Sequence, residues 1–347
     1  MKNYIVFDVG TYNTKILYGG YSNGYVMVKK TAVLKTPEGM VDNGMLDIDI
    51  ASDTLSEFLD NIQINPKLAM GAAVVVSSSI VSRSFSLPYS NQKELHNMVL
   101  MEVERLFSEV LQSYVMDYTC TNLNVLDDTK TADVMMFALP EKIHKAYEDV
   151  FINIGTKPAK LDVASNSSSK TFTQRLFIND IACPTDQTIA LMDIGHTTLN
   201  MQIIEKGVLK FCRVLKIGGA DITKAIMDDL DVPFEEAQHL KEHVVDLSEL
   251  VKSKATESAM RVLDDIANEI QRVLRYFASI STQGEVSLVY MYGGTSRIKN
   301  LSKFMQNILG CEVIPINTMN VIHLENDLPL DCYPSDFLNS AGTLVKL

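Results

Sequence analysis

Two short stretches of the chain place an aspartate, a glycine and hydroxyl-bearing residues where a strand could turn back on itself. They are Asp8-Val-Gly10-Thr11, after the apolar run Tyr4–Phe7, and Asp193-Ile-Gly195-His196-Thr197-Thr198, after the apolar run Ile189–Met192. Backbone N–H groups in such a turn can point at phosphate oxygens, and glycine allows close approach to the backbone. Carboxylates suit Mg²⁺, usually through water because this ion dehydrates reluctantly. The pattern predicts a metal–phosphate site with Asp8 and Asp193 at the metal.

A single turn of this kind is more often an ordinary connection, so the prediction depends on the repetition. Each turn is followed by a second β-like run, Thr14–Tyr18 in one case and Leu199–Ile204 in the other. Strand, glycine-based turn and strand form a β-hairpin signal. Two hairpins of one design indicate two similar lobes. Lys15, on the outgoing strand of the first hairpin, is expected to reach β- or γ-phosphates.

Two Gly-Gly turns accompany the hairpins, at Gly218-Gly219 and at Gly293-Gly294. Each follows a β-like run and precedes a helical pattern, so each can present N–H groups at a helix N-terminus. Either could be an ordinary strand–helix connection. Together with the two aspartate turns they describe one nucleotide cleft, in which we expect Gly294 to admit no side chain.

The elements that must position these turns alternate between strands and helices. Apolar residues at a spacing of three to four predict a long helix over 253–279 and a second over 95–111. Residues 132–138 and 287–292 read as strands, and 142–150 as a helix. Residues 165–169, Ser-Asn-Ser-Ser-Ser, read as a short polar junction. The mixture predicts an α/β architecture.

Composition narrows the class of protein. The 347 residues suggest two domains or one bilobal unit, and 46% hydrophobic residues supply a core. A net charge of −12 argues against a nucleic-acid partner, because phosphate neutralisation needs a basic face. No apolar run approaches the ~20 residues of a spanning helix, and the N-terminus does not read as a signal peptide. Five scattered cysteines fit a reduced, cytoplasmic protein.

The order of these turns resembles the actin/Hsp70/sugar-kinase ATPase superfamily: phosphate 1, connector, phosphate 2, ribose-binding helix and adenosine turn. Within it, the chain resembles the PilM family, cytoplasmic actin-like proteins of type IV pilus assembly that are similar to the division protein FtsA. The resemblance covers nearly the whole chain and includes residues 83–88, 115–118, 155–162, 215–219, 234–241 and 293–297. It implies a bilobal actin-like ATPase fold with the inserted subdomain of FtsA and PilM.

The resemblance also implies which residues bind MgATP. They fall into a first phosphate loop, a second phosphate loop, a turn beside the sugar and an adenosine turn: Asp8, Gly10, Thr11, Asn13 and Lys15; Asp193, Gly195, Thr197 and Thr198; Gly218 and Gly219; Gly293, Gly294, Thr295 and Arg297. The helix after Pro233 would offer Gln238 and Lys241 to the ribose. Glutamine stands where the family has glutamate, but it can still hydrogen-bond a hydroxyl. The alternative is that both residues belong to a solvated helix face.

The sequence offers no convincing residue to activate water. Asp162 matches the family's aspartate where the chain returns to the first lobe, and it could orient water near the metal or simply start a helix. His196 is more often a bystander in such a loop than a general base. We therefore expect ATP to be bound and its hydrolysis to be weak or absent.

The same resemblance implies the division into subdomains. Residues 1–82 would form the first lobe, subdomain 1A, completed by 157–182 and 332–347, with residues 83–156 as the inserted subdomain 1C. Residues 183–217 would form the second lobe, subdomain 2A, completed by 283–331, and residues 218–282 subdomain 2B.

A PilM-like protein would bind the cytoplasmic N-terminal tail of a PilN-like inner-membrane protein, between the inserted subdomain and the first lobe. It would meet other pilus assembly proteins, and reach the inner face of the membrane only through its partner. The alternatives are an FtsA-like filament-forming division protein and a small-molecule kinase. The chain lacks a sugar-kinase acceptor motif, and residues 340–347 are too short for the amphipathic membrane helix of FtsA. The PilM-like function is therefore favoured.

Overall fold

Both predicted hairpins form, and each belongs to one of the two main sheets. The computed structural model describes residues 2–107, 113–126, 129–172, 176–184, 186–248, 250, 253–281, 284–330 and 332–345. Strand β1 (Tyr4–Val9) pairs antiparallel with β2 (Asn13–Ser22), and β13 (Thr188–Ile194) with β14 (Leu199–Glu205). Gly10 N donates to Asn13 O at 3.2 Å, and Gly195 N donates to Thr198 O at 2.9 Å. The repeated sequence therefore closes two turns in the same way.

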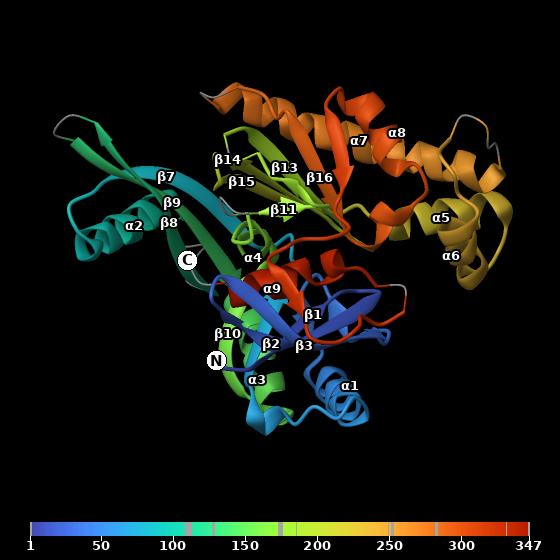
Figure 1. The fold of residues 1–347 in the computed structure, drawn as a ribbon, viewed down its shortest axis with the longest axis horizontal. Helices are drawn as coiled ribbons and strands as arrows, with labels where there is room; N and C mark the ends of the chain where they lie inside the picture. The colour runs from blue at the N-terminus through green and yellow to red at the C-terminus, as the bar shows by residue number, and fades with distance from the viewer. Residues whose placement is uncertain are drawn as a thin grey trace.

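The first sheet has the strand order β10-β6-β1-β2-β3-β18. Its other strands are β3 (Tyr25–Lys35), β6 (Met70–Val75), β10 (Lys157–Val163) and β18 (Ile322–Leu324). Helices α1 (Ile48–Asn61) and α3 (Glu141–Asn153) cover one of its faces (Figure 1). Phe7 of β1 meets Phe151 of α3 there, with ring centroids 5.9 Å apart. The buried face of each helix thus anchors it to the strand that carries Asp8.

The second sheet has the order β15-β14-β13-β16-β17. Its other strands are β15 (Val208–Leu215), β16 (Leu288–Tyr292) and β17 (Glu312–Pro315). The predicted long helix is confirmed as α7 (Lys254–Ile280), which begins at the N-cap Ser253 and buries a stripe that includes Leu263, Ile266 and Ile270. It packs on this sheet with α5 (Gly219–Leu230), α6 (Phe234–His243) and α8 (Leu301–Leu309). This layer places the Gly218-Gly219 turn at the start of α5.

A third sheet, β7-β9-β8, projects from the body together with α2 (Figure 1). Its strands are β7 (Val81–Pro88), β8 (Tyr114–Leu126) and β9 (Thr129–Pro140), and α2 spans Gln92–Phe107. Residues 108–111 of the predicted second helix lie outside the described residues. This inserted sheet and α2 lie almost entirely within residues 83–156, where the insertion is expected. Helix α3, from the same range, packs instead in the core of the first sheet.

A second expected boundary also shifts. Residues 322–324 were assigned to the second lobe, yet β18 pairs in parallel with β3 at the edge of the first sheet. The chain therefore returns to the first sheet before residue 331, and the rest of the subdomain division stays a prediction.

Two short helices lie between the two main sheets, and they cross at very close range (Figure 1). They are α4 (Ala164–Ser169) and α9 (Leu338–Leu344). A Cβ added at Gly342 of α9 would overlap the carbonyl of Ser167 in α4, and Ser167 Oγ lies 3.0 Å from Thr343 Oγ1. The prediction of a polar junction at 165–169 is therefore wrong. These residues belong to a buried helix, and their hydroxyls can be buried because they hydrogen-bond to the backbone and to the facing elements.

The remaining elements are short. They are β4 (Val41–Asp42) with β5 (Met45–Leu46), β11 (Phe177–Ile178) with β12 (Ile181–Ala182), and the 3₁₀ turns η1 (Pro66–Leu68), η3 (Gly294–Arg297) and η4 (Pro334–Phe337).

The crossing gives a testable expectation. Gly342→Ala should lower the free energy of unfolding by about 3 kcal/mol, because the added methyl must push α9 away from α4. Gly294→Ala is the matched control, since a Cβ there would meet no atom within 4 Å. Urea unfolding of both variants checks the expectation, and equal stability of the two would contradict it.

Candidate functional site

The turns of the two hairpins meet directly. Thr11 Oγ1 of the first turn lies 3.0 Å from Thr197 Oγ1 of the second, close enough for a hydrogen bond between residues of different sheets. Thr11 and Thr197 come shortly before Asn13 and Thr198, whose carbonyl oxygens accept the hydrogen bonds that close the two turns. The predicted first and second phosphate loops are therefore brought together.

The aspartates that begin the two turns lie in surroundings that disfavour their negative charge. Burial raises the pKa of Asp8 to about 6 and also raises the pKa of Asp193, and the charge of Asp193 adds to the effect on Asp8. Lys15, opposite Asp8 in β2, lowers the pKa of both carboxyls but does not offset burial. Asn339 of α9 donates to Asp193 Oδ2 at 2.9 Å. The site therefore favours a further positive charge beside the two carboxylates.

The glycine turns pack against the second hairpin. Gly219 N donates to Gly195 O at 3.0 Å, and Thr295 Oγ1 donates to the same oxygen at 2.9 Å. A Cβ at Gly218 would come within 2.6 Å of His196 O. The predicted sugar and adenosine turns are therefore joined to the second phosphate loop through its backbone carbonyls.

The two glycines of the adenosine turn differ. Gly294 was expected to admit no side chain because adenosine would approach its backbone, and in the ligand-free chain a Cβ there would meet nothing within 4 Å. Gly293 is the constrained residue: its φ is +91°, and a Cβ would overlap Asp193 Oδ1. Gly293 thus keeps the backbone close to a carboxylate, whereas Gly294 borders open space.

Gln238 and Lys241 form one buried network on α6. Lys241 Nζ donates to Gly219 O at 3.0 Å, to Thr223 Oγ1 at 2.8 Å and to Gln238 Oε1 at 2.8 Å. Burial lowers the pKa of Lys241 to about 8. Both side chains are only 5% exposed, so they are not a solvated helix face. In this state the three ammonium donors support the turn at Gly219.

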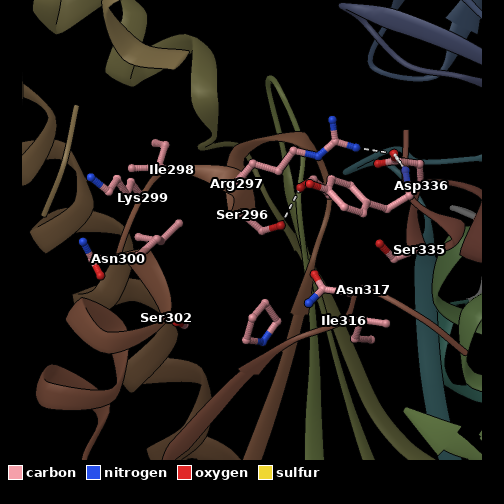
Figure 2. Close-up of a pocket in the computed structure, with 14 residues that line it drawn as sticks. Ser296, Arg297, Ile298, Lys299, Asn300, Ser302, Ile316, Asn317, Ser335 and Asp336 are labelled. Carbon is pink, nitrogen blue, oxygen red and sulfur yellow. Dashed lines mark hydrogen bonds and ion pairs between the residues drawn. The ribbon is translucent and has the colours of Figure 1, made fainter. Parts of the chain in front are cut away.

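Arg297 points away from the other predicted residues. Its guanidinium pairs with Asp336 and lies 4.9 Å from the centroid of the Tyr333 ring. Figure 2 shows this side chain reaching across to the segment before α9. A cavity of about 270 Å³ adjoins the pair and is lined by Gly293, Asn317 and their neighbours. Arg297 thus links the adenosine turn to the other lobe.

Asp162 and His196 have partners that favour structural roles. Asp162 pairs with Lys170 Nζ at 2.5 Å and accepts from Asn166 Nδ2 at 2.8 Å, which ties the end of β10 to α4. The ring of His196 lies 4.9 Å from the ring of Tyr12, centroid to centroid. The pKa of His196 is lowered to about 4; burial is the largest cause, and the charge of Lys241 is the next.

Sequence reasoning missed two residues that face the carboxylates, and both come from the C-terminal segment. Asn339 bonds Asp193, and the negative charge of Asp336 raises the pKa of both Asp8 and Asp193. The run of small residues around Gly342, which permits close helix packing, was the available signal. Residues 340–347 were judged only too short for a membrane helix, so α9 was not expected.

The donor set fits a nucleotide polyphosphate with Mg²⁺ held through water. Within the described residues, no group of three or more His, Cys, Asp or Glu side chains is placed to hold a metal directly. Asp8 is buried and Asp193 half-buried, and both have raised pKa values, so a divalent cation that keeps its water would stabilise their charged forms. The open space at Gly294 suits a ligand close to the backbone.

Solved structures define the class of protein. A structure described as a "PilM-PilN type IV pilus biogenesis complex" matches with a TM-score of 0.77 at 19% identity, covering 98% of this chain and 94% of that one. The ethanolamine utilization protein EutJ from Carboxydothermus hydrogenoformans matches with a TM-score of 0.58 at 15% identity, covering 99% of this chain and 89% of that one. MreB5 of Spiroplasma citri bound to AMPPNP matches with a TM-score of 0.55 at 12% identity, covering 99% of this chain and 95% of that one. The predicted actin-like ATPase fold is confirmed.

The particular family follows from the sequence. The model of the family described as "Type IV pilus assembly protein PilM" matches residues 7–331. The chain therefore belongs to the PilM family, as its turns and their order predicted. Among the helices of the described residues, none has the length and apolar character to cross a bilayer.

The buried carboxylate of Asp8 predicts how stability depends on pH. Its pKa is raised from 3.8 to about 6, so the folded protein holds this proton more tightly than the unfolded chain. The free energy of unfolding should fall by about 3 kcal/mol as pH rises from about 4 to about 6. Asp8→Asn should remove this fall and be more stable than the parent at pH 7. Urea unfolding across this range measures both effects.

The control for this expectation is Asp53→Asn, which removes an exposed carboxylate from α1. It should keep the pH profile of the parent. The same profile for Asp8→Asn would contradict a strained, buried Asp8.

Proposed function

We propose that this chain is a nucleotide-binding component of type IV pilus assembly that holds MgATP between its two lobes. The observation that carries the proposal is the meeting of the two hairpin turns, with Thr11 and Thr197 in contact and with the buried Asp8 and the half-buried Asp193 at the ends of the strands that lead into the turns. Two turns closed by the same glycine hydrogen bond present backbone N–H groups to one polyphosphate. Bound Mg²⁺ would neutralise phosphate charge.

The residues divide this task. Asp8 and Asp193 would hold the water of Mg²⁺, while Gly10, Asn13, Gly195 and Thr198 shape the turns that face the phosphates. Gly218 and Gly219, supported by Gln238 and Lys241, would border the sugar. Gly293, Gly294 and Thr295 would border the adenosine. The one candidate for water activation, Asp162, is paired with Lys170, so we expect binding with weak or no hydrolysis.

Asp193→Ala tests the metal assignment. The variant should lose about 1–3 kcal/mol of binding free energy for MgATP, because a charge-assisted contact is removed. Calorimetry with and without Mg²⁺ should show that the loss is confined to the metal-dependent part. Equal MgATP affinity of variant and parent would defeat the assignment.

A pair of neighbouring glycines separates binding from folding in the same experiment. Gly294→Val fills open space and should abolish nucleotide binding with little change in melting temperature. Gly293→Ala should instead destabilise the protein, because φ is positive and Asp193 is in the way. If Gly294→Val binds MgATP normally, adenosine does not lie at this turn.

We further propose that the cytoplasmic N-terminal tail of a PilN-like membrane protein binds beside α3. The similar solved structure is a PilM-PilN complex, and the chain offers a cavity of about 200 Å³ between α3 and β10. It is lined by His144, Tyr147 and Glu148 on one side and by residues 158–161 on the other. Helix α3 follows directly after β9 of the inserted sheet, and β10 is an edge strand of the first sheet, so this groove is our candidate for the expected docking region.

Two features make this groove suitable for an extended peptide. Strand β10 is the outermost strand of the first sheet, and in the described residues no strand pairs with its outer edge. An added strand could therefore bond to its backbone. Tyr147 is 2% exposed, and its hydroxyl has no hydrogen-bond partner among the described residues. A peptide polar group could satisfy that hydroxyl.

Tyr147→Phe tests the groove. The variant should fold as well as the parent, because it removes a buried hydroxyl without a partner, yet bind the tail peptide about tenfold more weakly. Leu123→Glu, on the exposed edge strand β8 of the inserted sheet, is the comparison. Titration of a labelled peptide against both measures the effect. A loss with Leu123→Glu alone would move the site to the inserted sheet, and no binding to the parent would refute the partner.

Through this partner the chain would lie at the inner face of the cytoplasmic membrane and meet other pilus assembly proteins there. The net charge of −12 gives the surface no general attraction to anionic lipids, which supports an indirect attachment.

A further inference from the structure

A lysine stands at the tips of the two phosphate turns and contacts both lobes. Lys35 is the last residue of β3, and its ammonium lies 4.5 Å from the centroid of the Tyr12 ring in the first turn. The same ammonium lies 5.9 Å from the ring of Phe234, the first residue of α6. One side chain thus spans from the first sheet to the helix that supports the sugar turn.

His196 completes this group from the second turn. Its ring lies 4.9 Å from that of Tyr12 and 6.5 Å from that of Phe234, centroid to centroid. The contact of Thr11 with Thr197 is formed by the immediate neighbours of these two rings. The charge of Lys35 is among the causes that lower the pKa of His196, after burial and Lys241. The ammonium is therefore electrostatically close to both turns.

The charge of Lys35 is held by rings instead of by an anion. In the part of the chain that the structure describes, no ion pair involves Lys35, whereas Arg297 is paired with Asp336. Lys241 has its three donors taken by oxygens, and Lys15 lies opposite Asp8. A cation–π contact at an exposed site is weak. A charge-assisted hydrogen bond to phosphate is stronger, so phosphate would displace the rings.

We propose that Lys35 is a phosphate-binding residue. When nucleotide enters between the turns, the Lys35 ammonium moves away from the rings of Tyr12 and Phe234 and contacts the polyphosphate. This inference rests on the proposed function, and it adds a cation from the first lobe that faces the second. The side chain is exposed and unbranched, so it can make this movement without disturbing the sheet. No sequence motif marks it, because it lies at the end of a different strand from either turn.

The test compares Lys35→Met with Lys29→Met. Lys29 lies on the same strand, and its ammonium is 5.9 Å from the ring of Tyr18, away from the turns. Calorimetry with MgATP at low salt should show about a tenfold loss for Lys35→Met and no loss for Lys29→Met. The loss should shrink at high salt, because the ammonium is exposed to solvent. Lys35→Arg should retain most of the affinity.

Adenosine separates a phosphate contact from a general effect on the cleft. It has the base and sugar without any phosphate, so its affinity should not change in Lys35→Met. Unchanged MgATP affinity, or an equal loss for adenosine, would overturn the role of Lys35 while leaving the proposed function intact. A parent protein that binds no MgATP would instead refute the proposed function itself.

Discussion

The arrangement of the site depends on the crossing of α4 and α9, where one backbone almost touches the other. The Ser167 carbonyl leaves no room for a side chain at Gly342, so α4 and α9 can pack at this short separation only with glycine there. Helix α4 follows directly from β10 of the first sheet, and α9 carries Asn339 to the aspartate of the second sheet. Separation of the helices would therefore separate Asp8 from Asp193. The small residues at this crossing fix the geometry of both lobes.

The carboxylates at the centre lower the stability of the ligand-free chain. Burial is the largest cause that raises the pKa of Asp8 and of Asp193; the charges of Asp193 and Asp336 also raise the pKa of Asp8, and the charge of Asp336 also raises that of Asp193. Natural sites of this kind trade stability for function. Lys15 and the Asn339 amide offset part of the repulsion without removing it. A cation with its bound water would therefore stabilise the folded protein as well as position a phosphate.

Local signals allowed much of the fold to be predicted. The hairpins follow from continuous apolar runs and turn glycines, and α7 from a regular apolar stripe, because these patterns lie within one element. Helix α4 was missed because its residues are serines and an asparagine, whose helix forms only through packing between the sheets. The dipeptide Gly293-Gly294 did not reveal which glycine has positive φ. Asn339 and Lys35 were missed because they reach the turns from distant segments.

The inserted sheet has contacts with both lobes. Strands β7 and β9 connect it to the first sheet through Val81 and α3, while Lys210 of β15 in the second sheet pairs with Asp133 of β9 at 2.8 Å. Cys212 of the same strand lies 3.2 Å from Ser82 Oγ, and Phe137 packs in the core between the sheets. A rotation that opened the lobes would have to slide β15 along this sheet. The contacts of the inserted sheet with both lobes therefore oppose a rotation of one lobe against the other.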